Sequence, residues 1–291
     1  MCPDTSGARI ASDACSSANR SSVFKPLAPH ACPTGMTRFL GALMLSVACS
    51  LCAGAQQGRG ESGLDWSKRL PSGSTITVQN GDGFIHVRES TSDRVEVRAT
   101  KASGSRTALN DIAFDVDERR DGATICTLYG SQRSCGDRAR SVRGSSMRVE
   151  YTVLVPRDIR INVSTGRGEI TVERVGSAVH ASTGSGRVFV STERGPVNVS
   201  SGSGDIDVRI LSSPADADIS AITGNGLIRA SVPSEFGGDV DTQSENGTFR
   251  SDFEITILGR IDAHHIRGTI GRGSSRIRLQ TGNGRIELRK S

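Results

Sequence analysis

A short pattern centred on a glycine recurs seven times between Ile161 and Leu288, and no other feature constrains the fold of this chain as strongly. Each copy has an apolar residue seven positions before the glycine and another two positions after it. Because one copy of this length cannot bury its own apolar face, the copies must stack on one another. The glycines are Gly168, Gly186, Gly204, Gly226, Gly247, Gly268 and Gly284.

Each copy is predicted to contain two short strands separated by a sharp corner. Apolar and polar residues alternate on both sides of the glycine, which is the period of a half-buried strand. Five copies read Gly-x-Gly at the corner, and glycine adopts the positive φ of a tight turn at little cost. A hydroxyl stands three positions before the glycine in six copies, and His265 replaces it in one. These hydroxyls are expected to bond to the turn backbone, notably Thr165, Thr183, Ser201, Thr223 and Ser244.

Two all-β architectures satisfy this pattern. In a parallel β-solenoid each copy is one rung, and equivalent residues stack about 4.8 Å apart. In an antiparallel array each Gly-x-Gly closes a hairpin instead. The same class of residue recurs at the same offset in every copy, as in-register stacking requires. The sequence therefore favours a parallel β-solenoid, or β-helix, of roughly seven short rungs.

The first 55 residues read as a processed segment. Residues 1–35 have no periodicity and are interpreted as an upstream misreading, with Met36 as the biological start. A charged residue and a short apolar run then predict a signal peptide over 36–55, cleaved after Ala55. A membrane anchor is an alternative, although a span needs roughly 20 apolar residues, and lipidation at Cys49 is another. The chain is expected in the periplasm, on the outer surface or secreted.

Cleavage after Ala55 would leave two of the seven cysteines, Cys126 and Cys135. An even pair in an exported chain predicts a disulfide. The remaining chain has 32 basic and 29 acidic residues, so its net charge is only +3. No nucleic-acid partner is expected at this charge.

The repeat pattern also appears once early, at residues 76–87, before an interval without Gly-x-Gly. Because the exposed end of a stack needs a cap, the strand-like runs of this interval predict an N-terminal antiparallel β cap. These runs are Arg94–Ala99, Ile112–Asp117, Thr124–Tyr129 and Met147–Val155. The predicted organisation is a flexible lead-in over 56–72, the first repeat copy plus the cap over 73–160, and the solenoid repeats over 161–289.

The residues leading into the repeats are distinctive. Residues 152–175 read TVLVPRDIRINVSTGRGEITVERV, followed by VHASTGSGRVFV at 179–190 and VNVSSGSGDIDV at 197–208. This stretch resembles the "putative adhesin" family of bacterial envelope proteins, which has a domain of unknown function. The resemblance covers about residues 73–289 and implies an exported β-solenoid at the cell envelope, with no catalytic residues. Copies five and six depart from the motif, with Glu245 and Ile266 in place of the first glycine.

The sequence predicts no catalytic residue, cofactor or metal site. A G-x-G-x-x-G match at 58–63 lacks the strand and helix that a dinucleotide site requires. His264 and His265 are adjacent on a predicted strand, so they point to opposite faces and cannot share a metal. Asp205 and Asp207 are typical of calcium-binding β-rolls, but the positions equivalent to Asp207 in other copies are not acidic.

An enzyme that acts on polysaccharides, either a lyase or a hydrolase on a β-helix scaffold, is the alternative function. Such a site needs paired carboxylates, or a base with acids, on one face. Glu169, Arg187 and Asp205 share one outward offset on three adjacent rungs, although charges on a strand surface commonly pair with one another. The aromatic platforms expected of a sugar cleft are absent. The sequence therefore favours a non-catalytic, adhesin-like binding or structural module.

The partner is expected to be a cell-envelope component or a surface polymer. One segment is strongly basic and rich in glycine and serine, with five arginines against a single acid, Asp137. Arginine forks suit phosphates and carboxylates, so this segment predicts peripheral contact with an anionic membrane or polymer. Its arginines are Arg133, Arg138, Arg140, Arg143 and Arg148.

Overall fold

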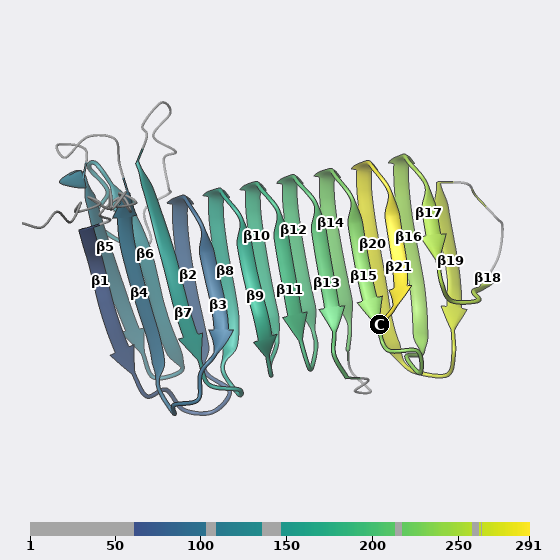
Figure 1. Ribbon diagram of the computed structural model, residues 1–291, viewed down its shortest axis with the longest axis horizontal. Helices are drawn as coiled ribbons and strands as arrows, with labels where there is room; N and C mark the ends of the chain where they lie inside the picture. Colours follow the sequence, from purple (N-terminus) through teal and green to yellow (C-terminus); the bar gives the residue numbers. More distant parts are fainter. Residues whose placement is uncertain (1–60, 103–108, 136–146, 213–216, 258–261, 263) are drawn as a thin grey trace, which may run out of the picture. The chain divides into compact units, whose positions relative to one another are not determined.

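A computed structural model describes residues 61–102, 109–135, 147–212, 217–257, 262 and 264–291, all within the compact unit Gln56–Ser291. The elements of these residues are twenty-one β-strands in two large sheets (Figure 1). The predicted signal peptide lies outside the described residues. Within the described ranges, no helix is long and apolar enough to span a membrane.

The strands form two sheets, called sheet A and sheet B. Sheet A has ten strands, in the spatial order β1 (Glu61–Lys68), β4 (Val95–Ala102), β7 (Arg148–Val155), β3 (Ile85–Glu89), β9 (Ile170–Val175), β11 (Val188–Thr192), β13 (Ile206–Ile210), β15 (Ile228–Val232), β21 (Ile286–Lys290) and β17 (Phe249–Ser251). Sheet B has eleven, in the order β18 (Thr256–Ile257), β19 (His265–Ile270), β16 (Gly238–Asn246), β20 (Ser275–Asn283), β14 (Ile219–Asn225), β12 (Val197–Ser203), β10 (Val179–Ser185), β8 (Arg160–Arg167), β2 (Thr75–Asp82), β6 (Gly122–Tyr129) and β5 (Ile112–Arg119).

Equivalent strands of neighbouring copies pair in parallel and in register. Val179 of β10 lies opposite Ile161 of β8 on one side and Val197 of β12 on the other. In every copy but the sixth, the first strand belongs to sheet B and the second to sheet A, and the chain crosses between the sheets at the corner glycine (Figure 1). This pairing excludes the antiparallel array, in which the two strands of one copy would pair with each other.

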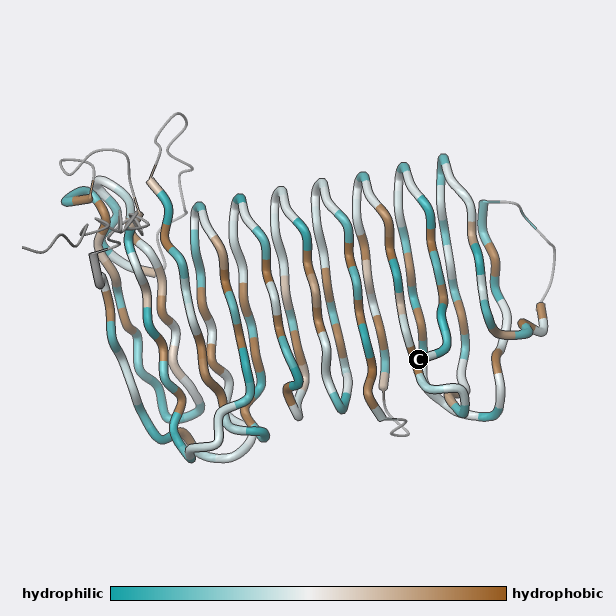
Figure 2. Tube along the Cα trace, in the orientation of Figure 1, coloured by the Kyte–Doolittle hydropathy of each residue, from teal (hydrophilic) through white to brown (hydrophobic). Residues whose placement is uncertain are grey.

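The core lies between the two sheets. Hydrophobic and hydrophilic residues alternate along the strands (Figure 2), and the inward Ile161, Val179, Val197 and Ile219 are at most 2% exposed. Each such side chain contributes about 1.5–3 kcal/mol on full burial. Because aromatic residues are few, this aliphatic stack carries most of the apolar burial.

The copies do not stack in sequence order at the C-terminal end. The seventh copy, β20 and β21, lies between the fourth copy, β14 and β15, and the fifth copy, β16 and β17. The sixth copy forms no parallel rung, because β19 pairs antiparallel with β16. Gly268, predicted as a corner glycine, is instead inside β19, opposite Val240. The early copy, β2 and β3, supplies a further parallel rung.

The N-terminal interval is mixed rather than wholly antiparallel. β6 and β7 pair in parallel with β2 and β3, so the predicted antiparallel cap is wrong for these two strands. Their inward residues, such as Ile125 and Val153, are fully buried and extend the core of the stack. β1, β4 and β5 do pair antiparallel. Residues 61–68, predicted as flexible, form β1 because Leu64 and Trp66 pack against the core.

Glycine at the corner allows the backbones of neighbouring rungs to approach closely. Gly186 has a φ of 148°, and a Cβ atom there would lie 2.1 Å from the carbonyl oxygen of Gly168. At Gly247 the corresponding distance to the oxygen of Gly284 is 1.7 Å. A side chain at either position would therefore force two rungs apart.

The predicted hydroxyl ladder runs between the rungs. Each hydroxyl three positions before a corner glycine donates to the corner carbonyl of the adjacent rung, and all are buried. Thr183 Oγ1 lies 3.1 Å from the oxygen of Gly168. The other pairs are Thr165 with Gly83, Ser201 with Gly186, Thr223 with Gly204, Thr281 with Gly226 and Ser244 with Gly284. The last two pairs follow the rearranged order of the copies.

Gly186→Ala should lower the free energy of unfolding by about 3–5 kcal/mol, because the new methyl group adds a backbone clash to the strain of a positive φ. Gly130→Ala is the matched control. Gly130 has a φ of 62° and no atom within 4 Å of a built Cβ, so strain alone should cost about 1–2 kcal/mol. Denaturant unfolding of both variants measures the difference, and equal losses would refute the contact between rungs.

Thr183→Val should lower the free energy of unfolding by about 0.5–1.5 kcal/mol, because the carbonyl of Gly168 loses its hydroxyl donor. Ser182→Ala is the control, since this neighbouring hydroxyl has no hydrogen bond among the described residues. Thermal melting of the two variants checks the prediction. If Thr183→Val melts at or above the temperature of the parent, the ladder does not stabilise the stack.

Candidate functional site

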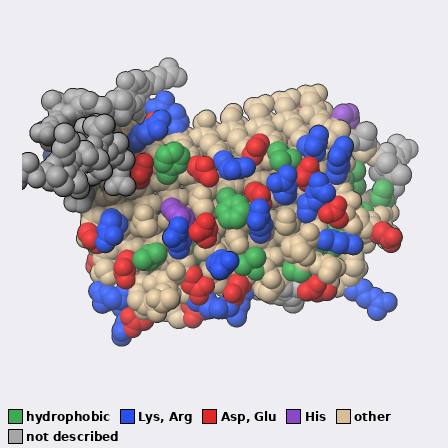
Figure 3. Space-filling view, in the orientation of Figure 1, with side chains coloured by type: hydrophobic (Ala, Val, Ile, Leu, Met, Phe, Trp, Pro, Cys, Tyr) green, Lys and Arg blue, Asp and Glu red, His purple; other side chains and the backbone are tan. Residues whose placement is uncertain are grey.

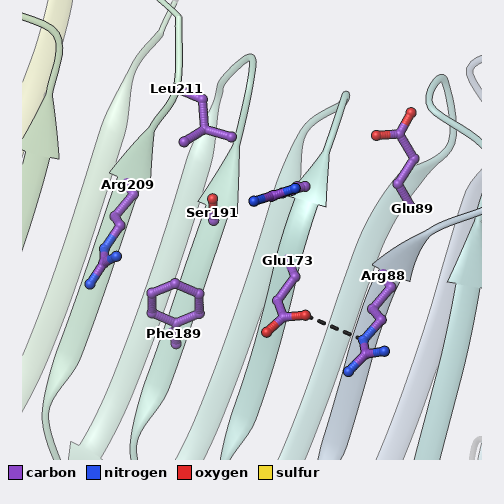
Figure 4. A pocket seen from close by; sticks show the side chains of 8 residues that line it. Arg88, Glu89, Glu173, Phe189, Ser191, Arg209 and Leu211 are labelled. Carbon is purple, nitrogen blue, oxygen red and sulfur yellow. Dashed lines mark ion pairs between the residues drawn. The ribbon is translucent and has the colours of Figure 1, made fainter. Parts of the chain in front are cut away.

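A groove of about 550 Å³ lies on the outward side of sheet A, across β3, β9, β11 and β13 (Figure 4). Arg88 and Glu173 line one side of it, and Arg209 and Leu211 line the other. Ser191 lies between these longer side chains, on β11. Because successive residues of a strand point to opposite faces, Val188 and Val190 enter the core while Phe189 and Ser191 face the groove. The short side chain of Ser191 leaves the groove open.

Phe189 and Arg209 form one end of the groove. The guanidinium carbon of Arg209 lies 5.0 Å from the centroid of the Phe189 ring, within the range of a cation–π contact. Asp207 orients the arginine, with Oδ1 3.2 Å from Arg209 Nε. Figure 4 shows the phenyl ring face-on in front of the sheet, so one ring face is turned outward. The sequence predicted no aromatic platform, yet an aromatic residue at an outward strand position was an available signal.

A β-bulge shapes the opposite wall. Val172 pairs with Val190 and Val175 pairs with Thr192, so two residues of β9, Glu173 and Arg174, face the single residue Ser191. Arg174 has a φ of 52° and is the one non-glycine residue of the described ranges with a positive φ. Bulges re-aim side chains and are common next to functional sites.

Glu173 is held by Arg88, with His86 beside the pair. Its Oε2 atom lies 3.3 Å from Arg88 Nε, the pair drawn in Figure 4, and 3.2 Å from His86 Nε2. His86 Nε2 is the acceptor of a hydrogen bond from Arg88 Nε at 3.0 Å, so Arg88 is the group that holds the carboxylate. The paired side chains of Glu173 and Arg88 hold each other in place, so they can form hydrogen bonds with a ligand.

A second charged cluster lies farther along sheet A, on β15 and β21. The side chain of Glu287 is 4% exposed and lies 3.1 Å from Arg229 Nε, 3.3 Å from Arg289 and 3.5 Å from Arg285. Burial raises the pKa of Glu287, but the hydrogen bond from Arg229 and the charges of Arg289 and Arg229 outweigh it, so the pKa lies below its ordinary value. Arg289 also contacts Asp252 after β17, so this network ties together three adjacent rungs.

The residues predicted for a polysaccharide-active enzyme have local hydrogen-bond partners. Asp205 accepts a hydrogen bond from the backbone N–H of Leu227 at 2.8 Å. Glu169 accepts one from the hydroxyl of Thr171 at 3.4 Å. Arg187 is exposed, and the described residues contain no ion pair that joins it to either carboxylate. Backbone hydrogen bonds from Ile170 to the carbonyl of Arg187 and from Val188 to that of Asp205 place the three residues on adjacent rungs.

Cys126 and Cys135 form a disulfide, with their Cα atoms 5.5 Å apart. The backbone N–H of Cys135 donates to the Asp115 carboxylate at 3.0 Å. These three residues are the candidate metal-binding group within the described ranges. Both sulfurs are bonded to each other, so neither is a thiolate that could ligate a metal.

The two adjacent histidines have separate partners. His264 Nδ1 lies 3.1 Å from the carbonyl oxygen of Ser244, and His265 Nε2 lies 2.7 Å from Asp241 Oδ1. Asp207, considered above for calcium, lies 3.7 Å from Arg229 in addition to its contact with Arg209. These groups are committed to contacts within the protein.

The arginine-rich segment is described only at its ends. Arg133 and Arg148 are exposed, and Arg148 Nε lies 3.7 Å from Asp82 Oδ1. Arg138, Arg140 and Arg143 lie outside the described residues. Its binding to an anionic surface stays a prediction.

No family model and no curated protein matches this chain. Among solved structures, the chain is similar to a putative cell adhesion protein from Clostridium sporogenes, with 11% identity and a TM-score of 0.47, over 79% of this chain and 100% of that one. It is also similar to a putative adhesin from Bacteroides fragilis, with 11% identity and a TM-score of 0.32, over 77% and 96%. A putative adhesin from Parabacteroides merdae matches with 7% identity and a TM-score of 0.30, over 77% and 95%. These values are too low to establish a family or a shared function.

Glu287→Gln should make the free energy of unfolding fall less steeply as the pH is lowered. A carboxylate whose pKa is lower in the folded than in the unfolded state stabilises the fold above the unfolded pKa, and this stability is lost as the pH falls through the folded pKa. The parent should therefore lose stability below about pH 4.5, the ordinary value for a glutamate, and the variant should lose less. Denaturant unfolding between pH 3 and pH 7 measures both slopes.

The control for this prediction is Glu89→Gln, on the same sheet. Glu89 has no ion pair among the described residues, so its loss should leave this fall as steep as in the parent. Identical slopes for the parent and Glu287→Gln would show that the cluster does not contribute to stability.

Proposed function

We propose that this chain is an exported, non-catalytic protein of the bacterial cell envelope, an adhesin-like binding or structural module whose stacked rungs form a β-solenoid. The observation that carries the proposal is the groove on sheet A. Its walls come from four adjacent rungs, which lie about 4.8 Å apart from one strand to the next. A site spread over successive rungs suits an extended partner, such as a surface polymer.

Export is supported by two independent features. Residues 36–55 have the charged start, the short apolar run and the small residues of a signal peptide. The disulfide between Cys126 and Cys135 suits a compartment outside the reducing cytoplasm. Both features are expected of a protein of the periplasm or the cell surface.

The chemistry of the described surface supports binding rather than catalysis. Basic and acidic side chains alternate over the face drawn in Figure 3, and hydrophobic side chains are scattered among them. Glu173, a carboxylate of the groove wall, is paired with Arg88. A glycosidase needs two carboxyl groups placed on either side of the scissile bond, whereas the two carboxylates of the described lining, Glu173 and Glu89, lie on the same side of the groove (Figure 4).

The test combines location with activity. In the producing bacterium, the mature chain should begin at Gln56 by mass spectrometry and be recovered with the cell envelope. The purified chain should bind isolated envelope polymers and leave acidic polysaccharides at their original length. A chain that begins at Met1 or Met36 in the cytoplasm would contradict export, and shortened polysaccharide would favour the lyase or hydrolase instead.

A further inference from the structure

Arg174 stands out among the residues of the groove because its backbone is strained and its side chain is unengaged. A positive φ places the Cβ of an arginine close to its own backbone, and glycine would occupy this position without that strain. Arg174 is exposed, lines the groove, and has no ion pair or hydrogen bond of its side chain within the described residues. A strained residue with no compensating contact inside the protein is typical of a functional position.

The other cations of the groove already have partners. Arg88 is paired with Glu173, and Arg209 is paired with Asp207 and packed against Phe189. Arg174 therefore supplies the one uncommitted guanidinium among the described lining residues. An arginine fork binds a carboxylate through two parallel hydrogen bonds, so the groove offers a site for a single carboxylate.

The rest of the groove complements a sugar ring. The outward face of Phe189 can pack against the C–H face of a pyranose, and the Glu173–Arg88 pair can accept from and donate to ring hydroxyls. Ser191, buried between the walls, offers a further hydroxyl at the floor. An apolar platform beside fixed polar groups is the usual composition of a small-molecule site.

Two other ligand classes fit less well. An extended peptide would need a free strand edge, but β9, β11 and β13 each pair with a strand on both sides. A phosphate dianion carries a second negative charge and would need more than one uncommitted cation, whereas the described lining offers the single guanidinium of Arg174.

We propose that this groove binds a saccharide unit that carries a carboxylate, with the carboxylate on Arg174 and the sugar ring on Phe189. The inference rests on the proposed function for its premise that the partner is an envelope polymer, and it adds the chemical class of that partner. The bulge in β9 turns Arg174 toward the groove, and the positive φ that this requires lowers the stability of the fold.

Calorimetric titration of the purified chain with an oligogalacturonate tests this proposal, and the methyl-esterified oligomer is the uncharged control. The parent should bind the acid form at least tenfold more tightly than the ester, because the ester cannot pair with a guanidinium. Phe189→Ala should weaken binding about five- to tenfold by removing the platform.

Arg174→Gly separates binding from folding. It should lose at least tenfold in affinity while its Tm rises by about 2–4 °C, because glycine relieves the strain of the positive φ. Arg160→Gly is the control: it removes the same charge from an exposed position on sheet B whose φ is not positive, so affinity should not change. A fall in the Tm of Arg174→Gly would overturn the premise of strain.

The outcomes distinguish this inference from the proposed function. If Arg174→Gly binds as well as the parent, or the ester binds as well as the acid, the groove is not the acidic-sugar site. If the parent binds isolated envelope polymers but no uronate, this inference fails and the proposed function stands. If the oligomer is bound and shortened, the ligand class is right and the non-catalytic function is wrong.

Discussion

The close contact between corner backbones is the constraint on which the rest of this structure depends. The carbonyl oxygen of Gly168 occupies the space that a side chain on Gly186 would need, and the same oxygen accepts the hydroxyl of Thr183. The glycine and the hydroxyl three positions before it are thus two parts of one contact. The glycine permits the approach, the hydroxyl satisfies the exposed acceptor, and repetition of the contact sets the spacing of the rungs.

The contacts that repeat from rung to rung occupy most residue positions of each copy, so few positions can vary with function. The inward residues fill the core and the corner residues bond to the next rung, so variable chemistry is confined to the outward positions of the strands. The groove arises where the repeat is broken, at the extra residue of β9 and at the small Ser191 beside it. A departure from a regular pattern without an evident structural benefit is the expected mark of a functional position.

Side-chain contacts connect the rearranged copies at the C-terminal end. Asn283 donates to Asn225 at 2.8 Å and accepts from Asn246 at 2.9 Å, so the three corner asparagines form one ladder. This ladder joins the fourth, seventh and fifth copies, in that spatial order. Arg229 and Glu287, which pair across the same junction, favour the same order. The apolar pattern alone could not identify the neighbours, because every copy presents the same inward residues.

The class of fold, the strands of the regular copies and the hydroxyl ladder could be predicted from the sequence, because they follow from local periodicity and from residue types at constant offsets. The cysteine pair followed from the number of cysteines that remain after the predicted cleavage. The sequence could not show which copies are neighbours, that Gly268 lies inside an antiparallel strand, or that β6 and β7 extend the parallel stack. These features depend on the tertiary structure. It also brought Arg88, Arg174, Phe189 and Arg209 to one groove. Such contacts join residues of different rungs, and a pattern that is the same in every rung carries no information about which side chains will meet.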